Sequence, residues 1–254
     1  MAWLKAKTRI APPVAAYAPV GEVVYAIGDV HGRDDLLATI IDRIEADATD
    51  APGLKARIVA LGDYIDRGPD SRRVIDRLIG LKHRYGDRLT LLRGNHEAAM
   101  LDFMHDTRVG VTWCEFGGRE TMASYGVIAA RGRKPEDWQA VQQALHDAVP
   151  EAHVQFLADL ETYAVFGDYV FVHAGLKPHV PLAQQSEEDM LWIRDEFLRA
   201  PPWLSQVVVH GHSPSSEPVE RPSRIGVDTG AYATGVLTAV RLEADQRSFL
   251  QTGV

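Results

Sequence analysis

Strands and helices alternate in the first part of this 254-residue sequence, and the alternation predicts an α/β fold. Three short apolar runs are typical of strands: Val23–Ile27, Ile58–Leu61 and Leu89–Leu92. Between them, apolar residues recur at helical spacing from Asp34 to Ala48 and from Ser71 to Tyr85. This order indicates parallel strands joined by crossover helices. The polar turns that follow the strands are therefore expected to meet at one edge of the sheet.

The second part of the sequence is expected to continue the same domain. Residues 97–165 predict a helical cap segment, after which strands resume at Tyr169–Val172 and Val207–Val209. The runs Ile225–Asp228 and Gly235–Arg241 are expected to close this half as a hairpin-like pair. No linker or repeat interrupts the chain, so we expect one domain over residues 1–254.

Composition narrows the class of protein. The formal net charge of -8 disfavours nucleic acid as a partner, and no apolar stretch is long enough to predict a membrane span. The single cysteine, Cys114, cannot form a disulfide within the chain and is expected to be a small apolar filler. These features favour a cytoplasmic protein.

The N-terminus carries a faint resemblance to a signal peptide. Lys5, Lys7 and Arg9 precede an apolar stretch, Ile10 to Val20. Prolines interrupt that stretch and the first strand follows at once. We therefore expect an irregular lead-in that packs on the domain, with a secretion signal as the alternative.

Six potential metal ligands follow the predicted strands. They are Asp29, His31, Asp63, Asn95, His173 and His212. Oxygen and nitrogen donors without a thiolate suit Mn²⁺, Fe or Zn²⁺. Six ligands exceed the needs of one catalytic ion, but they fit two ions that share a carboxylate. Such a pair lowers the pKa of a water between the ions and clamps both sides of a displacement at phosphorus.

Three further residues lie beside these ligands. Arg67 can hold two phosphate oxygens at once. His96 is placed to act as a general acid, with Asp66 as the partner that fixes its tautomer. A simpler interpretation is that Asp63 or Asp66 only caps the helix beginning near Ser71. The convergence of so many ligand types favours the metal site.

Five short motifs occur in order along the chain. They are Gly28-Asp29-Val30-His31-Gly32, Gly62-Asp63-Tyr64-Ile65-Asp66-Arg67-Gly68, Gly94-Asn95-His96-Glu97, His173-Ala174-Gly175 and Gly211-His212. Together they resemble the signatures of the phosphoprotein phosphatase family, in its bacterial serine/threonine type, within the metallophosphoesterase superfamily. The resemblance implies a β-sandwich of mixed sheets flanked by helices.

The resemblance also implies individual roles. Asp29, His31 and Asp63 would hold one metal ion. Asp63 would bridge to a second ion held by Asn95, His173 and His212. His96 with Asp66 would be the acid pair, and Arg67 the phosphate clamp.

Two assignments depend on shorter patterns. Leu191-Trp192-Ile193-Arg194 looks like the family's segment with a second phosphate-binding arginine, here Arg194. His210 and His212 are both candidates for the last ligand. The family pattern places the ligand after a small residue, which favours His212 after Gly211.

The expected activity is hydrolysis of phosphoserine and phosphothreonine in proteins, with phosphotyrosine as a further substrate. Phosphorylated proteins are then the expected partners, and two divalent ions, Mn²⁺ above all, the cofactors. The alternative on the same scaffold is a diadenosine-tetraphosphate or other nucleotide phosphohydrolase. Asp66 and Glu97 resemble the protein phosphatases more closely. A binding scaffold without activity would lack a ligand, and none is missing. The sequence does not predict an oligomeric state.

Several other residues are expected to be structural. Trp113, Phe116 and Tyr125 are assigned to the core of the helical cap segment, with a substrate platform as the alternative, and Glu97 to the start of a helix. The basic cluster Arg131, Arg133 and Lys134 is interpreted as a solvated loop, with a docking site as the alternative.

Overall fold

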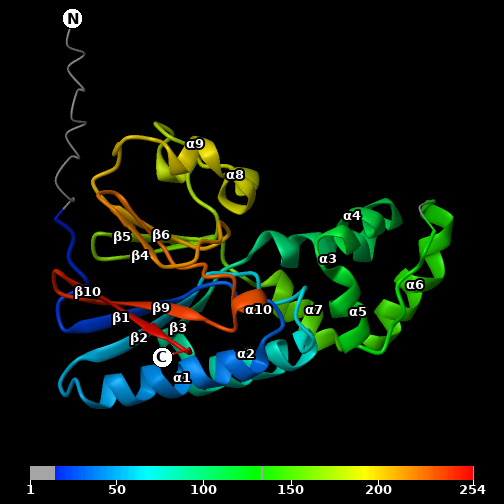
Figure 1. Ribbon diagram of the computed structural model, residues 1–254, viewed down its shortest axis with the longest axis horizontal. Helices are drawn as coiled ribbons and strands as arrows, with labels where there is room; N and C mark the ends of the chain where they lie inside the picture. The colour runs from blue at the N-terminus through cyan, green and yellow to red at the C-terminus, as the bar shows by residue number, and fades with distance from the viewer. Residues whose placement is uncertain (1–14, 133, 254) are drawn as a thin grey trace, which may run out of the picture.

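Two five-stranded sheets stack face to face in the computed structural model, which describes residues 15–132 and 134–253 (Figure 1). The first sheet has the order β10-β9-β1-β2-β3. Its strands are β1 (Glu22–Ile27), β2 (Lys55–Ala60), β3 (Leu89–Leu91), β9 (Thr238–Glu243) and β10 (Gln246–Gln251). β1, β2 and β3 are parallel, whereas β9 runs antiparallel to β1 and to β10.

The second sheet has the order β4-β5-β6-β8-β7. Its strands are β4 (Tyr163–Phe166), β5 (Tyr169–Val172), β6 (Val207–His210), β7 (Val219–Arg221) and β8 (Arg224–Gly226). β5, β6 and β8 are parallel, and the two edge strands are antiparallel to their neighbours. Both sheets are therefore mixed, as the resemblance implied.

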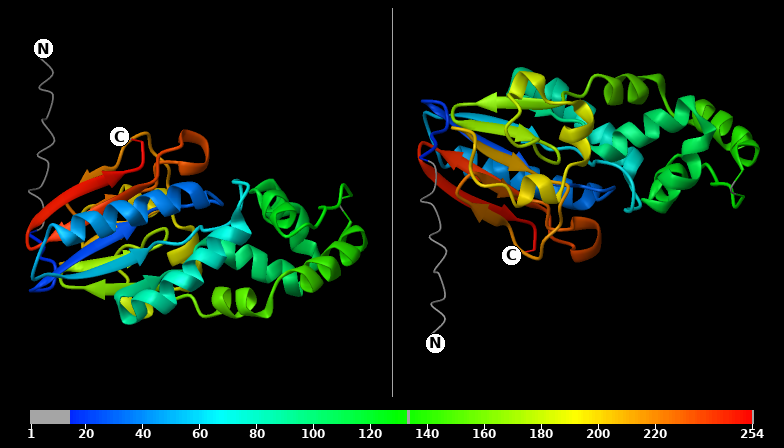
Figure 2. Two further views of the ribbon diagram at one scale, coloured as in Figure 1. Left: turned by 90° about the horizontal axis from the view of Figure 1, so that it is seen from below. Right: turned by 90° about the horizontal axis from the view of Figure 1, so that it is seen from above.

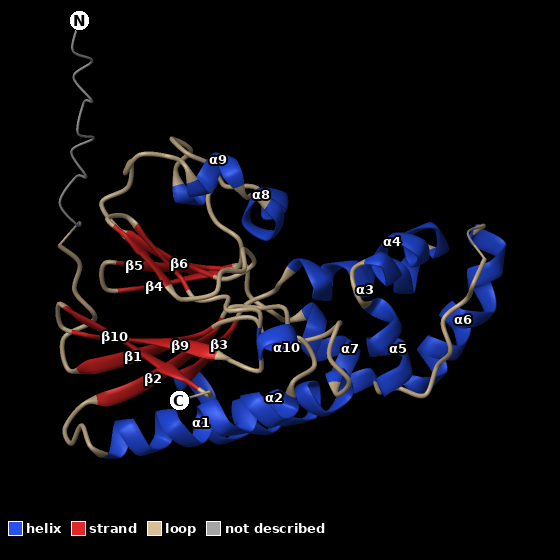
Figure 3. Ribbon diagram, viewed as in Figure 1, coloured by secondary structure: helices blue, strands red, loops and turns tan. Residues whose placement is uncertain are grey.

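Helices cover the outer face of each sheet (Figures 1 and 3). α1 (Asp34–Thr49) and α2 (Ser71–Tyr85) lie on the first sheet, and α8 (Glu187–Trp192) and α9 (Asp195–Leu198) on the second. Because side chains alternate along a strand, Val23 and Ile27 of β1 pack beneath α1, while Val24 packs between the sheets. Burial of both faces explains why this strand is a continuous apolar run.

A helical segment lies beyond the carboxyl ends of the first sheet's parallel strands (Figure 2). It comprises α3 (Asn95–His105), the 3₁₀ turn Thr107–Val109, α4 (Gly110–Glu115), α5 (Gly118–Ser124), α6 (Pro135–Ala148) and α7 (Glu151–Ala158). Short helices elsewhere are Gly86–Arg88, Leu182–Gln184 and α10 (Ala231–Thr234). The predicted cap, residues 97–165, extends too far, because Tyr163–Phe166 pairs with β5 as a strand.

One topological prediction is wrong. The runs Ile225–Asp228 and Gly235–Arg241 do not pair with each other, since β8 lies in the second sheet and β9 in the first. The intervening chain contains α10 and carries the backbone from one layer to the other. β9 instead forms a hairpin with β10, a strand that the sequence did not predict because it is half polar and only partly buried.

The described part of the N-terminal lead-in packs on both sheets. Ala18 donates its backbone N–H to the carbonyl of Ala244, and Tyr17 donates to the carboxylate of Asp168. The rest of the lead-in, including Lys5, lies outside the described residues. Among helices of the described ranges, none combines the length and apolar character required to span a bilayer.

Candidate metal centre

Polar side chains from five strand ends converge around Asp63, which follows β2. His31 follows β1, His96 lies in the first turn of α3, His173 follows β5 and His212 follows β6. All are at least 96% buried, although they lie at the end of the sheets where the chain turns. The carboxyl ends of parallel strands thus gather them, as the order of elements predicted.

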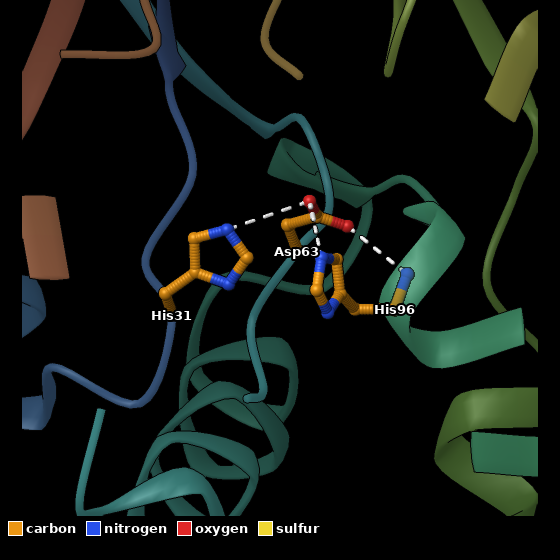
Figure 4. A group of neighbouring side chains, drawn as sticks. All are labelled: His31, Asp63 and His96. Carbon is orange, nitrogen blue, oxygen red and sulfur yellow. Dashed lines mark hydrogen bonds and ion pairs between the residues drawn. The ribbon is translucent and has the colours of Figure 1, made fainter. Parts of the chain in front are cut away.

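Two triads of potential ligands share Asp63. The first is His31, Asp63 and His96 (Figure 4), and the second is Asp63, His173 and His212. Oδ2 of Asp63 lies 3.6 Å from Nε2 of His31 and 3.7 Å from Nε2 of His96. Oδ1 lies 3.4 Å from Nε2 of His173. One carboxylate therefore faces both groups, the position that a bridging ligand requires.

Hydrogen bonds fix which imidazole nitrogen faces the centre. Nδ1 of His31 donates to the carbonyl of Ile65 at 2.9 Å. Nδ1 of His173 donates to the carbonyl of Leu61, also at 2.9 Å. In neutral rings the Nε2 atoms then carry lone pairs that point toward Asp63. Such a backbone partner on the outer nitrogen is what orients a metal-binding histidine.

The donor set around His173 fits a cation. Its Nε2 lies 2.9 Å from Oδ1 of Asn95 and 3.2 Å from Nδ1 of His212. The other nitrogen of His212, Nε2, is buried without a hydrogen-bond partner. Acceptors that face one another in a buried space raise the free energy unless a cation lies among them. A divalent ion held by Asp63, Asn95, His173 and His212 would satisfy them.

On the opposite side of Asp63, a cation is supplied by the protein. The guanidinium of Arg67 lies 3.0 Å from Nε2 of His31 through Nη1, and 3.2 Å from Nε2 of His96 through Nη2. When His31 binds a metal ion through Nε2, it cannot also accept from Arg67. The guanidinium fork is then available for another acceptor.

The protonation states suit metal ligands. Burial, outweighing the attraction of Asp63, lowers the pKa of His31 to about 3, and burial with the neighbouring His173 lowers that of His212 to about 2. Burial alone would raise the pKa of Asp63, but the surrounding imidazoles, His173 foremost, bring it below its usual value. At neutral pH His31 and His212 are neutral and Asp63 is ionised, the forms that bind metals.

Asp29 lies beside the centre but outside both triads. Its carboxylate accepts the backbone N–H of His212, at 3.0 Å for Oδ2. Burial and the neighbouring carboxylates of Asp228 and Asp63 raise its pKa well above the usual range. A nearby cation would reverse that shift. His96 belongs to the first triad, whereas Asp29, which the sequence predicted as a ligand of that ion, does not.

Sequence reasoning missed Asp228. This residue follows β8, is 4% exposed and has its pKa raised by burial, with Asp63 adding to the shift. The rule that located the other ligands, a polar residue after a parallel strand, also applies to it. It was overlooked because Ile225–Asp228 was assigned to a hairpin.

His96 and Asp66 form a buried dyad. Nδ1 of His96 donates to Oδ2 of Asp66 at 2.6 Å. The indole Nε1–H of Trp113 donates to the same oxygen at 2.9 Å, and the hydroxyl of Thr121 donates to Oδ1. Burial alone would lower the pKa of His96, but Asp63 and Asp66 outweigh it and raise the pKa. Trp113 and Thr121 of the helical segment thus fix the Asp66 carboxylate, which in turn orients the His96 ring.

Glu97 joins two of the motif turns. Its Oε2 accepts the backbone N–H of Asp63 at 2.9 Å and that of Gly94 at 2.8 Å. Its Oε1 accepts the N–H of Tyr64 at 2.8 Å. The residue does begin a helix, as expected, but its carboxylate also fixes the backbone of the turn that carries Asp63.

Backbone conformations that side chains disfavour concentrate at this centre. Five of the seven non-glycine residues with positive φ in the described ranges belong to it: His31, Asp63, Asp66, Arg67 and His212. The φ of Asp66 is 71° and that of Arg67 is 65°. Each such residue costs roughly 1–3 kcal/mol, and this strain is typical of functional sites.

Arg194 and His210 lie where the sequence suggested. Nη1 of Arg194 donates to the carbonyl of His212 at 3.0 Å, so its guanidinium lies beside the second triad. The His210 ring lies against Phe197, with 5.1 Å between centroids, and its Nε2 is 3.3 Å from Nη1 of Arg224. His210 belongs to neither triad.

The assignment of aromatic residues to the cap core holds for Trp113 and Tyr125, which are buried. It is wrong for Phe116, which is 41% exposed and lies 6.5 Å from the His96 ring between centroids. Phe116 lies in the turn after α4, next to His96 and outside the buried core that Trp113 and Tyr125 share. In the basic cluster, Arg131 and Lys134 are exposed, and Arg133 lies outside the described residues.

The sequence profile of the calcineurin-like phosphoesterases matches residues 23–245, nearly the whole chain. The chain belongs to the calcineurin-like phosphoesterase family. The resemblance inferred from the motifs is confirmed at this level, and so is the mixed α/β sandwich. Calcineurin-like phosphoesterases hydrolyse phosphoesters at a dinuclear metal site, and two ligand triads that share Asp63 fit such a site.

Known members of the family differ in the substrates that they are named for. A protein of Schizosaccharomyces pombe, provisionally named a serine/threonine-protein phosphatase, is 43% identical over 75 residues, which are 30% of this chain and 22% of that protein. The chain thus spans about a fifth of that relative's length.

Two solved structures share the fold over most of their length. A protein provisionally named a diadenosine tetraphosphatase has a TM-score of 0.62 at 21% identity, covering 93% of this chain and 98% of its own. A cold-active protein-tyrosine phosphatase of Shewanella sp. has a TM-score of 0.55 at 18% identity, covering 94% and 83%. At such identities the likeness concerns the fold and leaves the substrate class open.

Proposed function

We propose that this calcineurin-like phosphoesterase hydrolyses phosphate monoesters on proteins, namely phosphoserine and phosphothreonine, with phosphotyrosine as a further substrate. The observation that carries the proposal is the buried dyad of His96 and Asp66, whose N···O distance is 2.6 Å. Mn²⁺ is the proposed metal, with Fe and Zn²⁺ as alternatives that the oxygen and nitrogen donors also suit.

The dyad bears on the choice between protein and nucleotide substrates. The alkoxide of serine is a poor leaving group and needs a proton as the ester bond breaks, whereas a nucleoside phosphate leaves readily without one. A general acid contributes typically about 10²–10⁴-fold to the rate when the leaving group needs it. A carboxylate held by Trp113 and Thr121 only to orient His96 therefore supports an alkyl phosphate.

The residues would divide into two ligand sets. His31 and Asp63, with Asp29 beside them, would hold one divalent ion. The other ion would be held by the set predicted from the sequence, Asp63, Asn95, His173 and His212. Bound there, the two ions would supply a nucleophile from water at neutral pH and offset the charge of the phosphate.

Three side chains of the protein would bind the phosphate and protonate the leaving group. Arg67, released from His31, would bind two phosphate oxygens in a bidentate manner, and Arg194 would bind from the side of His212. His96 would give the proton on Nε2 to the leaving oxygen, because Nδ1 is engaged by Asp66. The carboxylates of Asp63 and Asp66 raise the pKa of His96, which favours the protonated ring.

The surface next to Arg67 also favours a monoester over a polyphosphate. An open hollow of about 490 Å³ adjoins this residue, and its charged lining includes Arg119 but also Glu115 and Glu120. Two carboxylates beside two guanidiniums do not suit a chain of four phosphates, which would need an excess of cations.

The proposal is tested with a substrate panel on the Mn²⁺-loaded protein. Phosphoserine, phosphothreonine and phosphotyrosine versions of one peptide are compared with diadenosine tetraphosphate by kcat/KM. We expect the phosphopeptides to be preferred by about tenfold or more. A preference for diadenosine tetraphosphate would overturn the proposal in favour of the nucleotide alternative.

A further inference from the structure

Exposed aromatic side chains gather at the metal centre. Four aromatic residues stand among the exposed large hydrophobic residues of the described ranges, and three of them surround this site. Phe116, Trp192 and Tyr232 are 41%, 42% and 41% exposed. They come from three different elements, namely the turn after α4, the end of α8, and α10. An exposed apolar group beside a buried charged centre is unfavourable unless something packs on it.

Each of the three rings lies against a different histidine of the centre. The centroid of Tyr232 is 5.4 Å from that of His31, and the centroid of Trp192 is 6.3 Å from that of His212. Phe116 lies 6.5 Å from His96. Each ring therefore lies next to a histidine of the centre.

The rings also contact one another and the phosphate clamp. Phe116 and Trp192 are 6.2 Å apart between centroids, so they form one continuous apolar wall. On the other side, Cζ of Arg67 lies 4.9 Å from the centroid of Tyr232. Arg67 is thus flanked by the wall on the His96 side and by Tyr232 on the His31 side.

We infer that Phe116, Trp192 and Tyr232, the aromatic rim, bind the organic group of the phosphoester and add affinity for aryl phosphates such as phosphotyrosine, the further substrate of the proposed function. The inference rests on the proposed function, because it places the phosphate at the metal centre. The group bonded directly to the ester oxygen then lies among the three rings.

The size of that group decides how much affinity the rim adds. Aromatic rings attract one another at centroid distances of about 4.5–7 Å, so a phenyl ring can contact more than one ring of the rim. The single methylene of phosphoserine is too small to do so. A nucleobase is separated from the phosphorus by a ribose and would extend past the rim. The rim therefore adds affinity for an aryl ester without excluding an alkyl one.

Binding and turnover test this inference with the Mn²⁺-loaded protein. The variants are Phe116→Leu, Trp192→Leu and Tyr232→Leu, which keep an apolar side chain but remove the ring. The binding probes are phenylphosphonate and methylphosphonate, which share the phosphonate group and are not hydrolysed. We expect the Kd of phenylphosphonate to rise about 3–10-fold in each variant and that of methylphosphonate to stay within about twofold. The kcat/KM for phosphotyrosine and phosphoserine versions of one peptide should show the same contrast.

Tyr17→Leu is the matched control. Tyr17 is 53% exposed but lies by Asp168, at the amino end of β5 and away from the centre. This variant should leave both Kd values unchanged. Metal content per chain is measured for all variants and should equal that of the wild type.

Two results would overturn the inference. Equal losses for the phenyl and methyl probes, or a loss of metal, would mean that the rings only support the histidines. Unchanged binding of phenylphosphonate would mean that they do not contact the substrate. Failure of the proposed function looks different: no phosphopeptide is hydrolysed by the wild type although diadenosine tetraphosphate is, while the phosphonate comparison still reports on the rim.

Discussion

The two sides of Asp63 differ in how their imidazoles are satisfied. On one side, Nε2 of His31 and Nε2 of His96 face the guanidinium of Arg67. On the other, Nε2 of His173 faces the oxygens of Asn95 and Asp63, and Nε2 of His212 has no partner. Arg67 therefore supplies a cation to the first side, whereas the second side requires a metal ion.

This difference suits the two sides to two different tasks in phosphoester hydrolysis, metal binding and substrate handling. The side of His173 and His212 is an acceptor set that favours a permanently bound ion. The side of His31 and His96 combines imidazole nitrogens with the guanidinium of Arg67, and His96 is the proposed acid. We therefore expect metal binding to depend most on the second side and substrate handling most on the first. Four experiments test this division.

Loss of metal should have the largest effect. Stripping the protein should reduce hydrolysis by about 10⁴-fold, because the ions supply several kcal/mol of charge stabilisation. His212→Ala should approach that loss and retain one ion per chain instead of two. Activity assays before and after Mn²⁺ addition, with metal content per chain, check both statements. Full activity of verified metal-free protein would contradict them.

His96→Asn should come next and should depend on the leaving group. We expect phosphoserine peptide hydrolysis to fall about 10²–10³-fold, since the proton donor is lost. Hydrolysis of nitrophenyl phosphate should fall far less, because nitrophenolate hardly needs a proton. Both ions should remain bound. Equal losses on the two substrates, with metals intact, would instead assign His96 to positioning the phosphate.

Arg67→Ala should impair all monoesters alike. The guanidinium would contact only the phosphate, and charge-assisted hydrogen bonds are worth about 1.5–3 kcal/mol each. We expect kcat/KM to fall about 10–100-fold for both phosphoserine peptide and nitrophenyl phosphate. A loss confined to one of the two substrates would be inconsistent with a phosphate clamp.

His210→Ala should have the smallest effect on activity. The ring packs on Phe197 and is buried, so its removal should lower the melting temperature by leaving a cavity. Metal content and kcat/KM should stay within about twofold of the wild type. Loss of an ion from this variant, but not from His212→Ala, would reverse the assignment of the two histidines.

Much of the centre could be predicted because its residues follow one rule. A polar residue after a parallel strand lies at the same edge as its counterparts on neighbouring strands, and this rule brought His31, Asp63 and His173 together without knowledge of the fold. The pairing of His96 with Asp66 was also predicted, because His96 directly follows the candidate ligand Asn95 and Asp66 lies in the turn of the candidate ligand Asp63. Individual ligand roles remain predictions that the metal-content experiments decide.

The failures arose where distant segments meet. Trp113 and Thr121 bond to Asp66 across 47 and 55 residues of sequence, and no local pattern indicates such contacts. The exposure of Phe116 depends on how the helical segment is placed against the sheets. The passage of the chain between sheets at α10 likewise depends on packing of layers, which strand propensity does not reveal.

The left-handed residues at the centre have an evolutionary consequence. Glycine adopts the conformation of Asp63, Arg67 or His212 without cost, whereas each of these side chains opposes it. Selection for stability alone would therefore favour glycine or asparagine at these positions. A relative that keeps the fold but has lost the chemistry should drift toward those residues first. Glycine at the positions of Asp63 and His212 would then identify an inactive descendant more surely than overall divergence of sequence.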